Sequence, residues 1–125
     1  MRLTFLGKES LPDQSPTLYA TDRGTYVVQG WIVTDPTVLA GIAVGDDETL
    51  VRVPAKLLEH LAKDGLDGEV GNHVPPIVHV LQDGQYIVRG RRVLDPEALG
   101  QMHVPDDETC VEVARSAMAA LLVGG

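Results

Sequence analysis

The stretch that decides the fold spans residues 23–61 and reads RGTYVVQGWIVTDPTVLAGIAVGDDETLVRVPAKLLEHL. A second version of it spans residues 83–121 and reads DGQYIVRGRRVLDPEALGQMHVPDDETCVEVARSAMAAL. With their flanks, residues 16–61 and 76–121 align without a gap at an offset of 60, and they are identical at 17 of 46 positions. A register kept over that length indicates a tandem duplication of one small unit, the kind of internal repeat that determines an architecture.

The repeated unit predicts a β-β-α-β-α order of elements. In the first copy, residues 16–20 open with proline and predict a short strand, because proline is tolerated at a strand start. The β-rich run Tyr26–Val33 follows a glycine turn and completes a hairpin. Asp35 followed by proline is typical of a helix start. A third strand over Thr49–Val53 and a closing helix to Leu61, with leucines at helical spacing, finish the unit.

The chain divides into residues 1–64, the first repeat unit with an extra N-terminal strand, a linker at 65–75, and the second unit at 76–125. Leu3–Leu6 predicts that extra edge strand, and Gly7–Ser15 predicts a loop. A unit of about 45 residues is too small to be comfortably stable alone. We therefore expect an α+β domain in which two tandem β-β-α-β-α units with antiparallel sheets pack with pseudo-twofold symmetry.

Charge and composition limit the classes of partner. The chain has 10 basic and 18 acidic residues, a net charge of −8, which argues against direct nucleic-acid binding or an anionic membrane surface. No apolar run approaches the roughly 20 residues of a membrane span. The lone cysteine, Cys110, excludes an internal disulfide and fits a reducing cytoplasm. We expect a cytoplasmic protein whose partner is another protein.

One strand face differs between the copies and is the candidate partner-binding surface. Side chains alternate along the strand predicted at Tyr26–Val33, and one face is identical in both copies, which assigns it to the core. The other face carries Gln29 and Trp31, where the second copy has Arg89 and Arg91. Tryptophan and arginine are enriched at binding hot spots. The alternatives are that Trp31 lies between the two halves or is a simple exposed aromatic residue. The arginines could likewise form ion pairs with acidic residues of the other half or a partner, or simply a solvated face.

The repeated acidic turns are a weaker candidate. They comprise Asp46, Asp47 and Glu48 in the first copy and Asp106, Asp107 and Glu108 in the second. Their spacing lacks the pattern of a calcium loop, and acidic residues are common in turns before strands. They are predicted to be structural turns with an acidic edge, with recognition of a basic partner as the alternative.

No other residue type forms a chemical constellation. None of the four histidines pairs with another histidine or a cysteine at metal-ligand spacing, and Cys110 is better explained as a small buried hydrophobic residue than as a nucleophile. The sequence therefore predicts no catalytic residues, no metal site and no cofactor.

Two motifs carry a resemblance. They are Y-V-V-Q-G-W-x-V-x-D-P, from Tyr26, and V-P-D-D-E-T, from Val104. With them and its LTFLGK start, the chain resembles small uncharacterised actinobacterial proteins of the Streptomyces type, about one repeat long, that are found near helix-turn-helix regulators. The resemblance implies a regulatory accessory protein and offers no catalytic residues to carry over.

The sequence thus predicts a non-enzymatic protein-interaction module, with a helix-turn-helix transcription regulator as the candidate partner. The alternative is a small-molecule-binding or enzymatic domain with its site in the cleft between the two repeats, since such interfaces commonly hold pockets. In that case Tyr26 and Tyr86, or the acidic turns, would converge there. A third hypothesis is a purely structural or assembly role.

Overall fold

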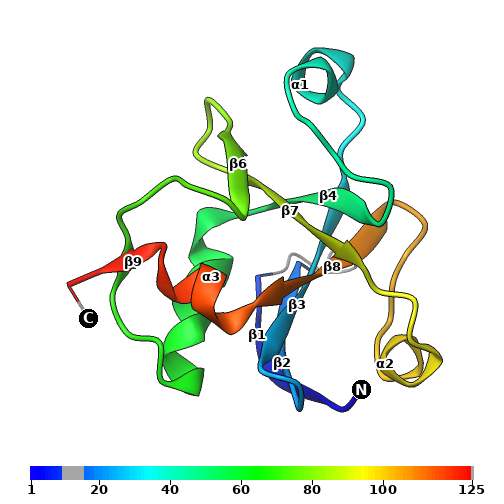
Figure 1. Ribbon diagram of the computed structural model, residues 1–125, viewed down its shortest axis with the longest axis vertical. Coiled ribbons are helices and arrows are strands. Elements are labelled where there is room, and N and C mark those ends of the chain that lie inside the picture. The colour runs from blue at the N-terminus through cyan, green and yellow to red at the C-terminus, as the bar shows by residue number, and fades with distance from the viewer. Residues whose placement is uncertain (10–15, 125) are drawn as a thin grey trace.

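The computed structural model describes residues 1–9 and 16–124 and shows a mixed α+β fold, as the sequence predicts (Figure 1). The elements follow one another in the order β1 (Leu3–Lys8), β2 (Thr17–Thr21), β3 (Thr25–Ile32), α1 (Pro36–Ala40), β4 (Glu48–Val53), the 3-10 helix η1 (Ala55–Asp64), β5 (Glu69–Val70), β6 (Ile77–Val80), β7 (Tyr86–Arg92), α2 (Pro96–Gly100), β8 (Glu108–Ala114), α3 (Arg115–Ala119) and β9 (Leu122–Val123).

One main antiparallel sheet contains strands from both halves of the chain. Its strands lie in the order β1-β2-β3-β4-β7-β6, and β8 pairs with both β3 and β7. The strands β3, β4, β7 and β8 therefore close on themselves, each pairing with two of the others. The longest pairings cross between the halves, from β3 to β8 and from β4 to β7. A small separate sheet joins β5 to β9.

The predicted core face of the hairpin strands is confirmed. Tyr26 and Val28 are 1% and 0% exposed. They belong to a central cluster that also holds the buried face of η1, namely Leu57, Leu58 and Leu61. The closing helix of the first half is thus a 3-10 helix that covers the core with its leucines. A second, smaller cluster beside α2 consists of Val27, Val93, Ala98 and Cys110.

Two glycines allow the crossing strands to come close together. A Cβ atom built on Gly30 would lie 2.6 Å from the carbonyl oxygen of Arg52, and one on Gly90 would lie 2.7 Å from that of Glu112. Backbone cannot yield to such an approach, so a residue without a side chain is required at both positions.

The helix starts follow the sequence prediction. The Asp35 carboxylate accepts hydrogen bonds from the backbone amides of Thr37 and Val38, and Asp95 caps α2 in the same way. Each aspartate precedes a proline at the first helical position, where a missing N–H costs nothing.

The N-terminal strand predicted at the sheet edge is present as β1, which pairs with β2. Gly7 and Lys8 extend this strand beyond its predicted end, and residues 10–15 of the predicted loop lie outside the described residues. The predicted linker at 65–75 contains β5, which is held by β9 from the C-terminal end.

Candidate functional site

A pocket beside α1 is the candidate site. It has a volume of about 250 Å³ and lies between the start of α1, the preceding loop, the turn after β6, and the outer face of β4 and β7. Its lining is apolar apart from Thr34 and two charged residues, Asp35 and Arg52. Ile87 is 1% exposed and forms part of the base, whereas Ile32 is 42% exposed.

Trp31 borders this pocket through Arg52. The two residues are opposite each other in the β3–β4 pairing and therefore project from the same face. The Arg52 guanidinium carbon lies 4.6 Å from the Trp31 ring centroid, and its Nη1 donates a hydrogen bond of 2.7 Å to Gln85 Oε1. Such a cation–π contact is worth about 0.5–1 kcal/mol at a partly exposed site. The half-buried indole thus has one face stacked against the guanidinium group.

The two predicted arginines pair with the acidic turn of the first half. Arg89 Nη1 donates to the carbonyl of Ala43 at 2.9 Å, and its Nε lies 3.8 Å from Glu48 Oε2. Arg91 Nε lies 3.7 Å from Asp47 Oδ2, with both side chains 72% exposed. These contacts match the ion-pair alternative, and exposed pairs of this kind contribute only about 0–1 kcal/mol.

Gln29 does not share the exposure of Trp31. It is 1% exposed, and its Nε2 donates to Glu108 Oε1 at 2.9 Å and to the carbonyl of His103 at 2.7 Å. The alternation that groups it with Trp31 is correct, but the segment that leads into β8 covers this end of the face. Gln29 therefore offers no atom to a partner and drops out of the candidate surface.

The two acidic segments form turns, and the glutamate of each turn accepts hydrogen bonds from within the chain. Asp46 and Asp106 are exposed, whereas Glu48 accepts the Gly45 amide at 2.9 Å and Glu108 is 4% exposed against Gln29. Among residues 1–9 and 16–124, no group of three or more His, Cys, Asp or Glu side chains is placed to hold a metal ion.

The tyrosines and the acidic turns do not converge between the halves. Tyr26 lies opposite Val113 in the β3–β8 pairing, and Trp31 lies opposite Glu108, five residues further along. At about 3.4 Å per residue this separates the two ends by roughly 17 Å. Tyr86, 8% exposed, is also part of the central cluster. Tyr26 thus lies apart from the acidic turn of the second half, and both tyrosines are buried in the central cluster; the cleft between the repeats stays a prediction.

Tyr26 instead belongs to a polar cluster beside η1. Its hydroxyl donates to Asp64 Oδ2 at 2.6 Å, and Arg115 Nη1 donates to the same carboxylate oxygen. Burial, together with the hydrogen bond to Asp64, holds the pKa of Tyr26 well above its usual range. The phenol stays protonated and ties β3 to the helices.

Cys110 is buried in the fold, and His60 contacts neighbouring charged side chains. Cys110 is 5% exposed, as the sequence predicts, and burial raises its pKa to about 11, which keeps the thiol protonated. His60 lies between Glu9 and Lys63, with its ring nitrogens 2.9 Å and 3.0 Å from their side-chain atoms.

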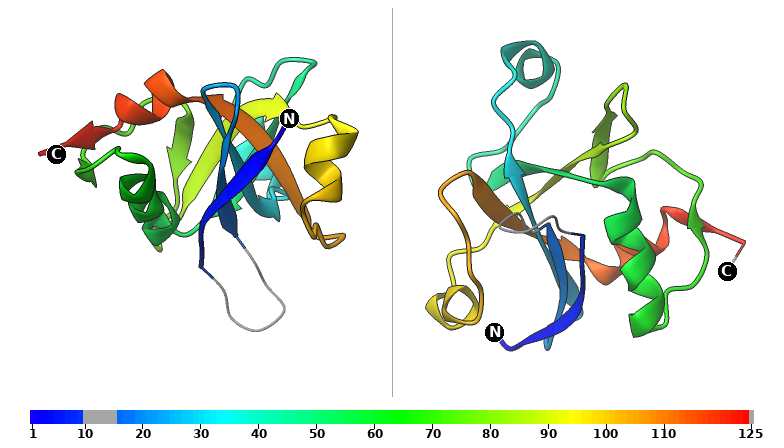
Figure 2. Two further views of the ribbon diagram at one scale, coloured as in Figure 1. Left: turned by 90° about the horizontal axis from the view of Figure 1, so that it is seen from below. Right: turned by 180° about the vertical axis from the view of Figure 1, so that it is seen from behind.

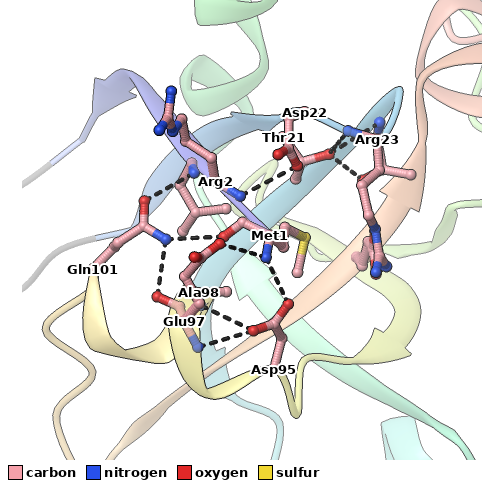
Figure 3. Close-up of polar contacts among 12 residues, drawn as sticks. Met1, Arg2, Thr21, Asp22, Arg23, Asp95, Glu97, Ala98 and Gln101 are labelled. Atoms are coloured by element: carbon pink, nitrogen blue, oxygen red, sulfur yellow. Dashed lines mark hydrogen bonds and ion pairs between the residues drawn. The ribbon is translucent and has the colours of Figure 1, made fainter.

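The chain's own first residue occupies the place beside α2 (Figure 3). The α-amino group of Met1 donates to Asp95 Oδ2 at 2.9 Å and to Glu97 Oε1 at 2.7 Å. These hydrogen bonds raise the pKa of the amino group to about 10. Gln101 holds the adjoining backbone, since it donates to the Met1 carbonyl and accepts from the Leu3 amide, each at 2.9 Å. The Met1 side chain packs against the small cluster beside α2.

Comparison with known proteins adds no relative: no family model matches the chain, and neither the curated proteins nor the solved structures give a match. Within residues 1–9 and 16–124, no helix combines the length and apolar character needed to cross a membrane.

Proposed function

We propose that the chain is a non-enzymatic protein-interaction module that acts as an accessory to a regulator and binds its partner at the pocket beside α1. The observation that carries this proposal is the Trp31–Arg52 pair at the border of a pocket that combines aliphatic side chains with Thr34, Asp35 and Arg52. Tryptophan and arginine are the residue types that most often dominate binding energy. A concave apolar surface with few polar groups is the usual form of a binding site.

We also propose that the two halves are tandem β-β-α-β-α units related by pseudo-twofold symmetry, with bounds at 1–64 and 76–125. Contacts that recur at the offset of 60 support this. Tyr26 pairs with Val113 and Tyr86 pairs with Val53, and both halves start their first helix with a capping aspartate followed by proline. Divergence of one copy would then have made the surroundings of α1 and α2 different on an otherwise symmetric scaffold.

For the partner we propose a helix-turn-helix transcription regulator in the cytoplasm. This rests on the resemblance of the chain to proteins found near such regulators and on its net charge of −8, which complements a basic protein surface.

The test compares Trp31→Ala with Arg91→Ala, because residues 31 and 91 hold matching positions in the repeat. Each tagged variant and the wild type serve as bait in a lysate of the native host at several salt concentrations. We expect a regulator to be captured by the wild type and by Arg91→Ala but not by Trp31→Ala, because Arg91 forms only an exposed ion pair. Equal capture by a folded Trp31→Ala variant would contradict the proposed surface.

A further inference from the structure

The pocket beside α1 has a counterpart beside α2 that the chain fills by itself. At the offset of 60, five of the eight pocket residues, Val33, Asp35, Val38, Leu81 and Ile87, correspond to Val93, Asp95, Ala98, Thr21 and Val27. Met1 packs on the cluster that contains three of these counterparts and binds a fourth, Asp95. In the views of Figure 2 the N-terminus lies next to α2 (yellow), whereas α1 (cyan) lies far from it.

The filled place shows how a polypeptide is held there. The strand β1 adds to the free side of β2, with Leu3 opposite Thr21, and the Asp22 amide donates to the carbonyl of Arg2 at 3.1 Å. Beyond this pairing, the Met1 amino group reaches Asp95 Oδ2, while Oδ1 of the same carboxylate caps α2. A single aspartate thus serves the helix with one oxygen and a cationic chain end with the other.

The same elements are available beside α1. Asp35 caps its helix through Oδ1, and no described residue donates to its Oδ2. Among the described strands β6 pairs with β7 alone, which leaves its other edge unpaired, and Leu81 directly after it lines the pocket. Figure 1 shows β6 at the same end of the molecule as α1.

The apolar side chains beside α2, where Met1 is bound, are more buried than their counterparts beside α1. Val93 is 7% and Ala98 is 0% exposed, whereas their counterparts Val33 and Val38 are only half-buried. An unpaired strand edge beside a partly exposed apolar pocket is the arrangement to which extended peptides add as a further strand.

We propose that the edge of β6 and the pocket beside α1 bind one extended segment of the partner, which begins with a free amino group and an aliphatic side chain. The segment adds antiparallel to β6, its ammonium group binds Asp35 Oδ2, and its first side chain enters the pocket over Ile87. This inference rests on the proposed function and specifies the chemistry of the partner. Because Thr37 stands where Glu97 provides a second carboxylate, binding here is weaker than the intramolecular contact.

Arg52 is compatible with a cationic chain end in this pocket. Its guanidinium group is directed to Trp31 and Gln85. Its counterpart Glu112 is likewise engaged elsewhere, by Arg23 and Thr25, and has no hydrogen bond to Met1. The stacked Trp31–Arg52 pair therefore reports on the occupied pocket without taking part in the binding of the ammonium group.

The probe is the synthetic peptide MRLTFLGK, the sequence of residues 1–8, added to the full-length protein. It contains no tryptophan, so the fluorescence of Trp31, the single tryptophan of the chain, reports its binding. We expect a saturable change with the free peptide and about threefold to tenfold weaker binding of its N-acetylated form, which has lost a charge-assisted hydrogen bond. Amide chemical shifts at residues 79–81 should move as the strand is added.

Two matched variants locate the site. Asp35→Asn keeps an oxygen for the helix cap but removes the charge, and we expect it to weaken the peptide by about threefold to tenfold. Asp95→Asn makes the same change on the filled side and should leave the affinity within about twofold. If Asp95→Asn instead weakens peptide binding, the peptide replaces β1 beside α2, and the proposed site is wrong. Equal affinity of the free and the acetylated peptide would also contradict the proposed site. So would the absence of a saturable fluorescence change at millimolar peptide. Loss of the peptide response with continued Trp31-dependent capture of a regulator would overturn this inference alone and leave the proposed function standing.

Discussion

Gly30 and Gly90 are the residues at which the closed arrangement of strands is least tolerant of change. We expect Gly30→Ala to destabilise the protein by about 1–3 kcal/mol, because its Cβ would lie 2.6 Å from the backbone oxygen of Arg52 and 2.6 Å from Cγ1 of the buried Val53. Gly100→Ala is the control, since nothing lies within 4 Å of its Cβ, and alanine favours the helical conformation there. Urea unfolding measures both. A Gly30→Ala variant as stable as the wild type would contradict the close approach.

The amino group of Met1 makes the free energy of unfolding vary with pH in the alkaline range. Its pKa is raised from 8.0 to about 10 by hydrogen bonds to Asp95 and Glu97. A group whose pKa is raised by folding contributes its full stabilisation below the unfolded pKa and loses it as the pH rises through the folded value. We expect the difference in free energy of unfolding between the wild type and Asp95→Asn to be constant at neutral pH and to shrink between pH 8 and 10. A difference that stays constant beyond pH 10 would exclude the ammonium contact.

Among the elements, α1 and α2 share a capping chemistry but differ in what they bury. We expect Asp35→Ala to cost at most about 1 kcal/mol, because α1 has no buried residue and its cap is the main loss. Asp95→Ala should cost more, because α2 buries Ala98 and the same carboxylate holds Met1. The measurement is the urea midpoint of both variants, and equal losses would contradict the different roles of the two helices.

The order of the elements is predictable from the sequence because its signals are local. Alternation along Tyr26–Val33 places the core face correctly, and an aspartate before proline marks both helix starts. The burial of Gln29 depends on Glu108 and His103, more than 70 positions away, and alternation carries no information about them. The contact of Met1 with Asp95 spans 94 positions and leaves no periodic signal either. Of the candidate site, only the position of Trp31 could therefore be predicted from the sequence.

At the scale of the whole molecule, the two halves depend on each other for their sheet. The pairings of β3 with β8 and of β4 with β7 join the halves over most of their strand length. We expect fragments 1–75 and 76–125 each to lack a cooperative unfolding transition, and an equimolar mixture to recover one with native-like circular dichroism. A fragment that unfolds cooperatively on its own would contradict the dependence of each half on the other.

The central claim is that one pocket beside α1, bordered by Trp31, binds a protein partner. Its most direct test is calorimetric titration of the captured regulator with the wild type, Trp31→Ala and Arg91→Ala. The account predicts that Trp31→Ala weakens the dissociation constant by about thirtyfold or more, as expected for a hot-spot residue, while Arg91→Ala stays within about threefold. The same affinity for Trp31→Ala and the wild type, or a larger loss with Arg91→Ala, would contradict it.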